Sequence, residues 1–216
     1  MMDETIIFDK IRDLSVQYAQ NLQRQIRLRN EEMKSDDKSH YLIYRILGIS
    51  ASEGEKIDIY QNKGRFLYKY AGSFLEEAAL LCFRFCDPNS QMKQRIPNTA
   101  GKTPKTFEID CLSGNFAHEI KWRDATTDGD HITKEHTRLQ VIREAGYIPV
   151  RVMFYSPNRS QAQKIQAALE TLYHGVGGQY YAGQVAWDYI HHFTGIHLLS
   201  ILERIAATKT GETDAD

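Results

Sequence analysis

Two carboxylates and one amine near the middle of the chain have the types and spacing that a metal ion and a phosphate require. They are Asp110, Glu119 and Lys121, within the segment KTFEIDCLSGNFAHEIKWR of residues 105–123. Glu119 and Lys121 are two positions apart, so on a strand they project from the same side, roughly 6.5–7 Å apart at Cα. If Asp110 ends a neighbouring strand, all three side chains converge where a divalent metal, a water and a phosphate can meet.

The residues around these side chains alternate in polarity as strands do. In the first run Phe107 and Ile109 share one face, and Asp110 lies on the other face with two polar residues. In the second run residues 116, 118, 120 and 122 point one way, and residues 117, 119, 121 and 123 point the other way. Ser-Gly-Asn at 113–115 favours a turn, so the two runs are predicted to pair as a β-hairpin.

The pattern acidic-x-Lys is short and occurs at three places in the chain: 32–34, 36–38 and 119–121. The first two lie in a polar, charge-dense stretch without strand alternation. Only the third has an acidic residue, Asp110, on a plausible partner strand upstream. The alternative interpretation is that Glu119 and Lys121 pair on an exposed strand, where such a pair contributes little to stability.

Asp110, a spacer of eight residues and Glu119-Ile120-Lys121 resemble the motif of the PD-(D/E)XK nuclease superfamily, the fold of most restriction endonucleases. Ile109 stands where that motif has a proline, which carries no chemistry. The resemblance implies an α/β protein with a restriction-endonuclease-like core. Its central mixed β-sheet would be flanked by helices, with a helical N-terminal region and a helical C-terminus. Residues 106–155, which include EIKWRDATTDGDHITKEHTR, are similar to the ApaLI-like restriction endonucleases; this similarity implies a type II enzyme, a homodimer that cuts a palindrome in double-stranded DNA.

The chemistry implied is hydrolysis of a phosphodiester bond. Asp110 and Glu119 offer hard oxygen ligands that suit Mg²⁺, and the resemblance implies the carbonyl of Ile120 as a further ligand. A bound metal lowers the pKa of its water and polarises the phosphoryl oxygen. Lys121 would orient or help to deprotonate that water and offset charge in the transition state. One metal ion and two metal ions are both compatible with the sequence.

A helix that precedes the hairpin is a candidate source of one more carboxylate. Apolar residues between 73 and 85 recur at helical spacing. At 3.6 residues per turn, Glu77 lies at the edge of this apolar stripe and Glu76 lies nearly opposite. Families that the chain resembles commonly take a carboxylate from such a helix. Glu77 is therefore the candidate for a further catalytic residue and metal ligand, with an ordinary boundary residue as the alternative.

The polar residues that follow the catalytic strand are predicted to contact DNA, because they must lie near the substrate. They offer donors and acceptors for base edges or phosphates, and they are Thr126, Thr127, Asp128, His131, Lys134 and Arg138. Residues 88–105 are expected to form a loop that carries Lys93 and Arg95 and no acidic residue. That loop either contacts backbone phosphates or is simply solvated. A second candidate for DNA contact is Gln-Tyr-Tyr at 179–181.

The composition is that of an ordinary soluble globular protein. The chain has 216 residues, 42% of them hydrophobic and 25% charged, and a formal net charge of −1. The net charge is therefore not strongly positive, as it is in many DNA-binding proteins. An acidic metal site can, however, offset basic surfaces in the net charge. Three cysteines without framework spacing, the lack of a secretory signal and the lack of a long apolar stretch predict a cytoplasmic protein with no membrane partner. The resemblance implies a bacterial source.

We expect a single nuclease domain over residues 1–216. It would comprise a helical N-terminal region (1–70), a catalytic core (71–175), C-terminal helices (176–207) and a disordered tail (208–216). A long amphipathic helix over 4–34 is interpreted as a packed helix, or as a dimer arm or phosphate grip. Residues 56–86 are expected to be helical in pieces, interrupted at Gly64 and Gly72. The hairpin, a helix over 131–145 and a strand over 147–155 predict a βαβ-like unit, so that part of the sheet is parallel.

Two other functions compete with restriction. One is a structure-selective DNA-repair or junction-resolving nuclease of the same fold, which would cut only branched or damaged DNA. The other is a non-enzymatic DNA-binding or interaction protein. For that protein, Mg²⁺ would change neither DNA cleavage nor thermal stability.

Overall fold

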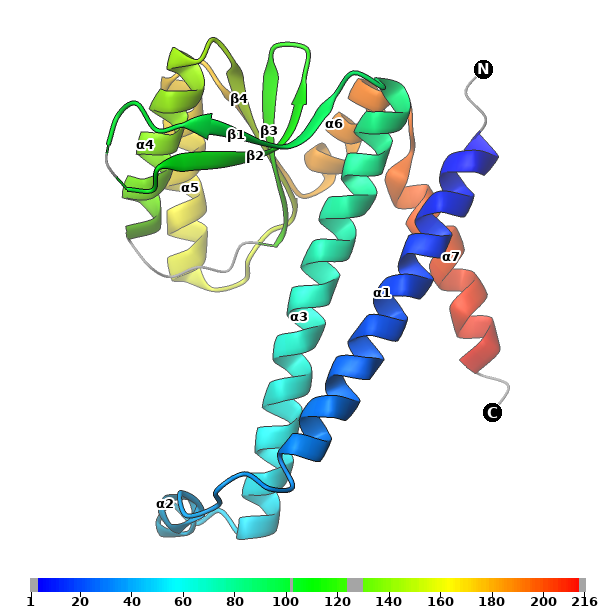
Figure 1. Ribbon diagram of the computed structural model, residues 1–216, viewed down its shortest axis with the longest axis vertical. Helices are drawn as coiled ribbons and strands as arrows, with labels where there is room; N and C mark the ends of the chain where they lie inside the picture. Colours follow the sequence, from blue (N-terminus) through cyan, green and yellow to red (C-terminus); the bar gives the residue numbers. More distant parts are fainter. Residues whose placement is uncertain (1–3, 102, 124–129, 214–216) are drawn as a thin grey trace. The chain divides into compact units, whose positions relative to one another are not determined.

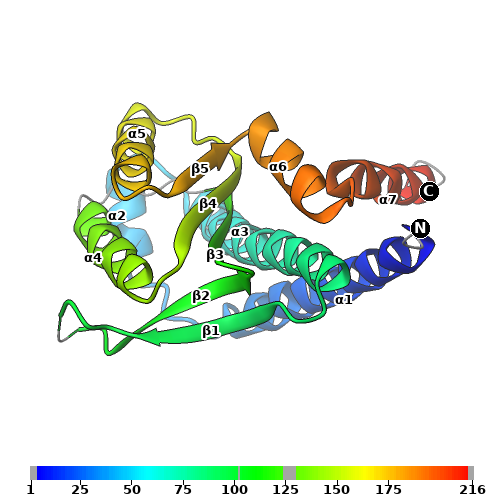
Figure 2. The same ribbon diagram turned by 90° about the horizontal axis from the view of Figure 1, so that it is seen from above.

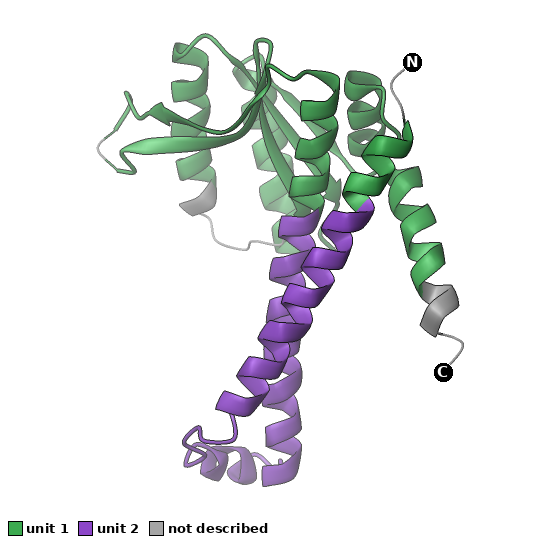
Figure 3. Ribbon diagram, turned by 45° about the vertical axis from the view of Figure 1, so that its right-hand side comes forward, with its two compact units in different colours: residues 1–11, 75–216 green, residues 12–74 purple. Residues whose placement is uncertain are grey.

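The chain divides into two compact units, one formed by residues 1–11 and 75–216 and the other by residues 12–74 (Figure 3). The computed structural model describes residues 4–101, 103–123 and 130–213. The prediction that all 216 residues act as one nuclease domain stays a prediction.

The larger unit is built on a five-stranded mixed sheet in the order β1-β2-β3-β4-β5 (Figures 1 and 2). The first three strands pair antiparallel, whereas β3–β4 and β4–β5 pair parallel. The parallel pair β3–β4 confirms the expected crossover through a helix. The strand bounds are Gln91–Pro97 (β1), Thr106–Ser113 (β2), Phe116–Arg123 (β3), Ile148–Tyr155 (β4) and Gln179–Ala182 (β5).

Helices cover both faces of this sheet. Figure 2 shows α4 (Asp130–Glu144) and α5 (Ser160–Gly175) on one side, and α6 (Gln184–Thr194) with the end of α3 on the other. The central strand β4 reads as a nearly continuous apolar run, as expected for a strand covered on both faces. Val150, Val152 and Met153 in it are buried. The sheet and its helices form an α/β fold, as predicted, with helical N-terminal and C-terminal parts.

The smaller unit contains parts of two long helices joined through a short one. These are α1 (Glu4–Glu32), α2 (Tyr41–Ile46) and α3 (Ala51–Cys86). Tyr18 of α1 packs edge-on against Tyr70 and Phe74 of α3. Tyr44 donates a hydrogen bond to Asp58 at 3.0 Å, which fixes α2 against the first turns of α3.

Several element boundaries differ from the predictions. Helix α3 is continuous through Gly64 and Gly72, because an isolated glycine costs a helix only about 1 kcal/mol relative to alanine. Residues 88–105 are not all loop, since they contain β1, and β5 lies in the region expected to hold only C-terminal helices. Helix α7 (Leu198–Thr213) continues into the segment expected to be a disordered tail.

Candidate active site

The β2–β3 hairpin brings Asp110 next to the Glu119–Lys121 segment. The ladder between the two strands joins Ser113 to Phe116, Leu112 to Ala117 and Cys111 to His118. Asp110 comes next along β2. Its side-chain Oδ2 accepts a hydrogen bond from the backbone N–H of Ile120 at 2.8 Å. The carboxylate therefore lies beside the main chain that links Glu119 to Lys121.

Glu119 and Lys121 project from the same face of β3, as the period of two requires. Their side chains form an ion pair, with Lys121 Nζ 2.6 Å from Glu119 Oε1. Glu119 is only 7% exposed, and its second oxygen, Oε2, pairs with the guanidinium of Arg138 on α4. Both oxygens of this carboxylate are thus held by cations. An exposed surface pair, the alternative interpretation, does not describe this arrangement.

Arg138 is directed into the site and not toward solvent. Its guanidinium also donates to the backbone carbonyl of Glu108 at 2.8 Å, and its side chain is 11% exposed. The DNA contact predicted for this residue stays a prediction. In the structure the Arg138 guanidinium contacts Glu119 and the Glu108 carbonyl.

Behind Arg138 lies a buried polar cluster that sequence reasoning missed. Glu135 lies 3.7 Å from Arg138 and 3.6 Å from the fully buried Arg151 of β4. Tyr173 of α5 donates a hydrogen bond to the same Glu135 carboxylate at 2.6 Å. The β3–β4 register places Arg151 beside Glu119. One signal was available, because a charged residue in the middle of an apolar strand needs a buried partner.

The two site carboxylates have opposite pKa shifts. Burial raises the pKa of Asp110, and the nearby negative charge of Glu119 raises it further. Burial alone would also raise the pKa of Glu119, but the charges of Arg138 and Lys121 outweigh burial and hold that pKa well below its usual range. One carboxyl group is therefore kept ionised, while the ionisation of its neighbour is penalised. Added positive charge would remove that penalty.

The residues present fit a Mg²⁺ ion better than an all-protein metal cage. Within residues 4–101, 103–123 and 130–213, no three His, Cys, Asp or Glu side chains form a group that could hold a metal ion. Mg²⁺ usually keeps several waters and needs only one or two carboxylates from the protein. Asp110 and Glu119 are two such carboxylates, and their mutual repulsion favours a cation beside them.

The helix before the hairpin also reaches the site, although through an unexpected residue. Lys93 Nζ of β1 lies 3.2 Å from Asp110 Oδ1 and also pairs with the carboxylate of Glu76 on α3. Glu77 is exposed. The catalytic role expected for Glu77 stays a prediction, and Glu76 of α3 contacts the Lys93 ammonium.

The remaining DNA-contact candidates are distributed unevenly. Lys134 is exposed on α4, and Arg95, with a side chain 71% exposed, lies 3.5 Å from Glu108. His131 belongs to the first turn of α4. Tyr181 of the second candidate segment stacks on Tyr189 of α6, so it is partly committed to packing. Three predicted residues lie outside the described part of the chain: Thr126, Thr127 and Asp128.

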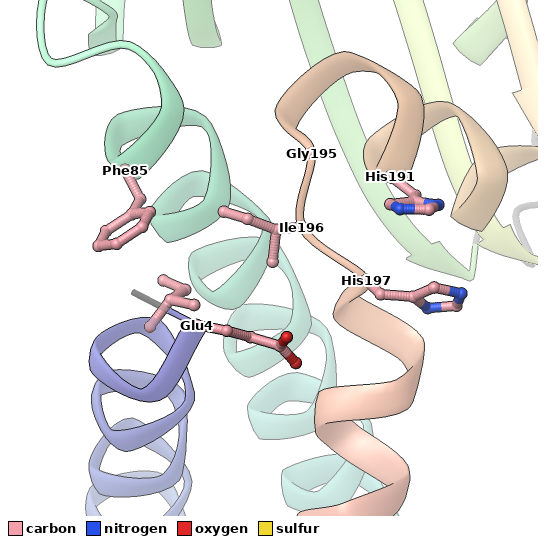
Figure 4. Close-up of a pocket in the computed structure, with 7 residues that line it drawn as sticks. Glu4, Phe85, His191, Gly195, Ile196 and His197 are labelled. Carbon is pink, nitrogen blue, oxygen red and sulfur yellow. The ribbon is translucent and has the colours of Figure 1, made fainter. Parts of the chain in front are cut away.

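Two of the cavities lined by described residues of the larger unit lie away from the predicted catalytic side chains. One of about 310 Å³ lies just beyond Lys121, at the ends of β3 and β4, and includes Trp122, Arg123 and Tyr155 in its lining. The other, of about 390 Å³, lies between the start of α1, the end of α3 and the α6–α7 junction (Figure 4). Its lining includes His191 and His197, whose ring centroids are 4.6 Å apart. The candidate active site is described by its charged side chains, Asp110, Glu119 and Lys121.

None of the helices that the structure describes combines the length and apolar character needed to cross a membrane.

Comparison with known proteins identifies the family of the chain. Searches of curated proteins and of solved structures gave no match. The model of the ApaLI-like restriction endonuclease family matches residues 2–207, nearly the whole chain and including Asp110, Glu119 and Lys121. The chain therefore belongs to the ApaLI-like restriction endonuclease family.

Proposed function

We propose that the protein is a sequence-specific type II restriction endonuclease of the PD-(D/E)XK superfamily, which hydrolyses phosphodiester bonds of double-stranded DNA with Mg²⁺. Family membership supports a restriction endonuclease. The observation that carries the rest is the Asp110 carboxylate bonded to the Ile120 N–H, with Glu119 and Lys121 on either side along β3. Two carboxylates and one amine in this order suit metal-assisted attack of water on a phosphate.

Each residue has a defined task in this proposal. Asp110 and Glu119 hold the metal, together with the carbonyl of Ile120. A third carboxylate comes from α3, either Glu77, which the sequence predicts, or Glu76, which contacts Lys93. Bound Mg²⁺ supplies charge neutralisation and a more acidic water.

Lys121 orients the attacking water and offsets negative charge as the phosphate reacts. Arg138 keeps Glu119 ionised and fixes the position of its Oε2. Asp110 is anchored by the backbone of β3, so its other oxygen points in a fixed direction. The chain's own residues therefore supply orientation, charge and a proton-handling amine.

The proposed partners follow from the same chemistry. Double-stranded DNA would be contacted by the segment 126–131 and by the exposed side chains of Lys134 and Arg95, mainly through phosphates. A homodimer is proposed because a two-fold enzyme matches a two-fold site and cuts both strands. A cytoplasmic location in a bacterium is proposed on the same grounds.

The test is incubation of unmethylated phage DNA with the protein, in Mg²⁺ or in chelator, followed by sequencing of the new ends. The proposal predicts a ladder of defined fragments in Mg²⁺ only, with every end at one recurring sequence. Cleavage confined to branched or damaged DNA would support the repair or junction-resolving alternative. Intact DNA in both conditions would support a non-enzymatic protein.

A further inference from the structure

The first inference concerns Lys93 and depends on the proposed function. Met92 and Gln94 pair with Cys111 and Ile109, so the register of β1 places Lys93 directly opposite Asp110. Its ammonium contacts Asp110 Oδ1 at 3.2 Å and the carboxylate of Glu76. A single cation thus joins an acidic residue of β2 to an acidic residue of α3.

The backbone at Lys93 supports a specific role for this residue. Its φ is +54°, and Lys93 is the non-glycine residue with positive φ in the described part of the chain. Residues other than glycine, asparagine and aspartate seldom adopt this conformation, and such residues concentrate at functional sites. Lys93 therefore adopts a backbone conformation that is unfavourable for a lysine.

We propose that Lys93 is a built-in counter-ion of the metal site. In the absence of metal its ammonium neutralises Asp110 and Glu76, and it must release Asp110 before that carboxylate can bind Mg²⁺. The side chain is 44% exposed, so the ammonium has access to solvent once released. Lys93 would then be free to contact a DNA phosphate, which is the contact that its sequence position predicts.

If Lys93 competes with the metal for Asp110, its removal should change the affinity of the protein for a divalent metal ion. Removing a competing cation should tighten metal binding, by about tenfold for a half-exposed ammonium. The variant is Lys93→Asn, because asparagine is neutral and tolerates positive φ. The control is Arg95→Asn, which removes the same charge from the same strand but from a side chain that pairs with Glu108.

Mn²⁺ binding to the full chain without DNA is measured by isothermal titration calorimetry. We expect Lys93→Asn to bind about tenfold more tightly than the parent and Arg95→Asn to bind as the parent does. In chelator, Lys93→Asn should also unfold at a lower temperature than the parent, and added Mn²⁺ should remove this difference. Lys93→Gly, which accepts the same φ freely, replaces Lys93→Asn if the latter does not fold.

The possible results distinguish a failure of the role of Lys93 from a failure of the proposed function. Unchanged or weaker Mn²⁺ binding in Lys93→Asn, with normal binding by the parent, would overturn the role of Lys93 and leave the proposed function standing. Absence of Mn²⁺ binding in the parent would remove the metal site, and with it both the proposed function and this inference.

The smaller unit exposes much of its apolar surface. Ten of the thirteen large hydrophobic side chains that are exposed in the described residues belong to residues 12–74. In the same range Leu14 and Tyr41 are the large apolar side chains that are buried. A unit with so little core of its own needs apolar surface from elsewhere to be stable.

The exposed residues of α3 have the spacing of a helix-packing seam. Ile57, Tyr60, Gly64 and Leu67 follow the alternating three- and four-residue steps of a heptad. The three large side chains are 48%, 69% and 53% exposed, respectively. At Gly64 nothing lies within 4 Å of an added Cβ, so a neighbouring helix can approach closely there.

Helix α2 and the residue that follows it add four more exposed apolar residues: Leu42, Ile43, Ile46 and Leu47. With Tyr68, the two helices present eight such side chains. At roughly 100 Å² each they amount to about 800 Å², which is the share of one partner in a standard protein interface.

We propose that this surface of α2 and α3 binds the same surface of a second copy of the chain. Cleavage of both DNA strands needs two catalytic sites, and each chain has one candidate site, so a second copy is the partner that the proposed function requires.

The test is the molar mass of the full chain in solution, measured by light scattering after gel filtration. The parent should be a dimer at micromolar concentration, and Leu67→Glu should be a monomer because it buries a charge in the seam. Lys69→Gln makes the same change of charge at an exposed position outside the heptad seam and should remain a dimer.

Ile46→Glu on α2 provides a second variant in case Leu67→Glu does not fold. A monomeric parent, or a dimer that persists in both glutamate variants, would overturn the proposed interface. The DNA cleavage assay is read separately, so loss of the dimer surface and loss of the proposed function are distinguishable.

Discussion

Replacing Arg138 by glutamine tests whether the buried guanidinium holds the Glu119 carboxylate in place. Arg138 pairs with Glu119, donates to the Glu108 carbonyl and lies near Glu135, all within the buried part of the site. Removal of one partner of a buried ion pair costs about 3–5 kcal/mol, because the other charge stays buried. Lys121 still reaches Glu119 at 2.6 Å, so we expect a value near 3 kcal/mol, the lower end of that range.

The loss should depend on pH with a defined sign. In the parent the pKa of Glu119 lies well below its usual range, so its ionisation contributes stability above the ordinary glutamate pKa of about 4.3. That stability is lost as the pH falls toward the folded pKa. In Arg138→Gln the pKa of Glu119 rises, so Glu119 can protonate and relieve its buried charge. The difference between the two proteins should therefore be largest near neutral pH and shrink as the solution is acidified.

The assay is urea unfolding of both proteins from pH 8 down to pH 4. The control is Arg143→Gln on the same helix, whose guanidinium makes one long hydrogen bond, 3.4 Å, to the Tyr147 carbonyl. It should cost under about 1 kcal/mol at every pH. Equal losses for the two variants, or a loss in Arg138→Gln that is independent of pH, would refute the reasoning.

Three further predictions concern acid stability, DNA contact and the third carboxylate. Burial lowers the pKa of His118 to about 4, so stability should fall by about 3 kcal/mol as the pH drops from about 6.5 to 4. His118→Phe should flatten that part of the unfolding curve, and an unchanged slope would contradict the account. Lys134→Ala should reduce the slope of log affinity against log salt by about 1 in an anisotropy titration with duplex DNA, whereas an unchanged slope would exclude a phosphate contact. Glu76→Gln should slow single-turnover cleavage more than Glu77→Gln, because the Glu76 carboxylate is joined through Lys93 to Asp110; the reverse order would support Glu77.

The hairpin and the face that carries the candidate site residues could be predicted from the sequence because both depend on local patterns. A period of two assigns Glu119 and Lys121 to one face, and the turn at 113–115 then brings Asp110 to the same end of the pair. The Asp110–Ile120 hydrogen bond follows from that pairing. The spacing of residues along the two strands was therefore enough to predict that Asp110, Glu119 and Lys121 lie close together.

The cluster behind the site could not be predicted in the same way. The contacts of Arg138 with Glu119 and of Tyr173 with Glu135 depend on how α4 and α5 pack on the sheet, which no short pattern encodes. Strand β1 was missed because it is an edge strand with mostly exposed polar residues, so it lacks the apolar alternation on which strand prediction depends. For the same reason the position of Lys93 opposite Asp110 could not be foreseen.

We propose that Asp110, Glu119 and Lys121 form one metal-dependent hydrolytic site, and removal of the Lys121 amine tests it. The most direct measurement is the Mg²⁺-dependent cleavage rate of Lys121→Ala on a DNA that the parent cuts, with binding of that DNA in Ca²⁺ measured in parallel. The account predicts a rate reduced by at least about a hundredfold, as expected for loss of a proton-handling group, with DNA binding retained. A Lys121→Ala protein that cuts at the rate of the parent would contradict it.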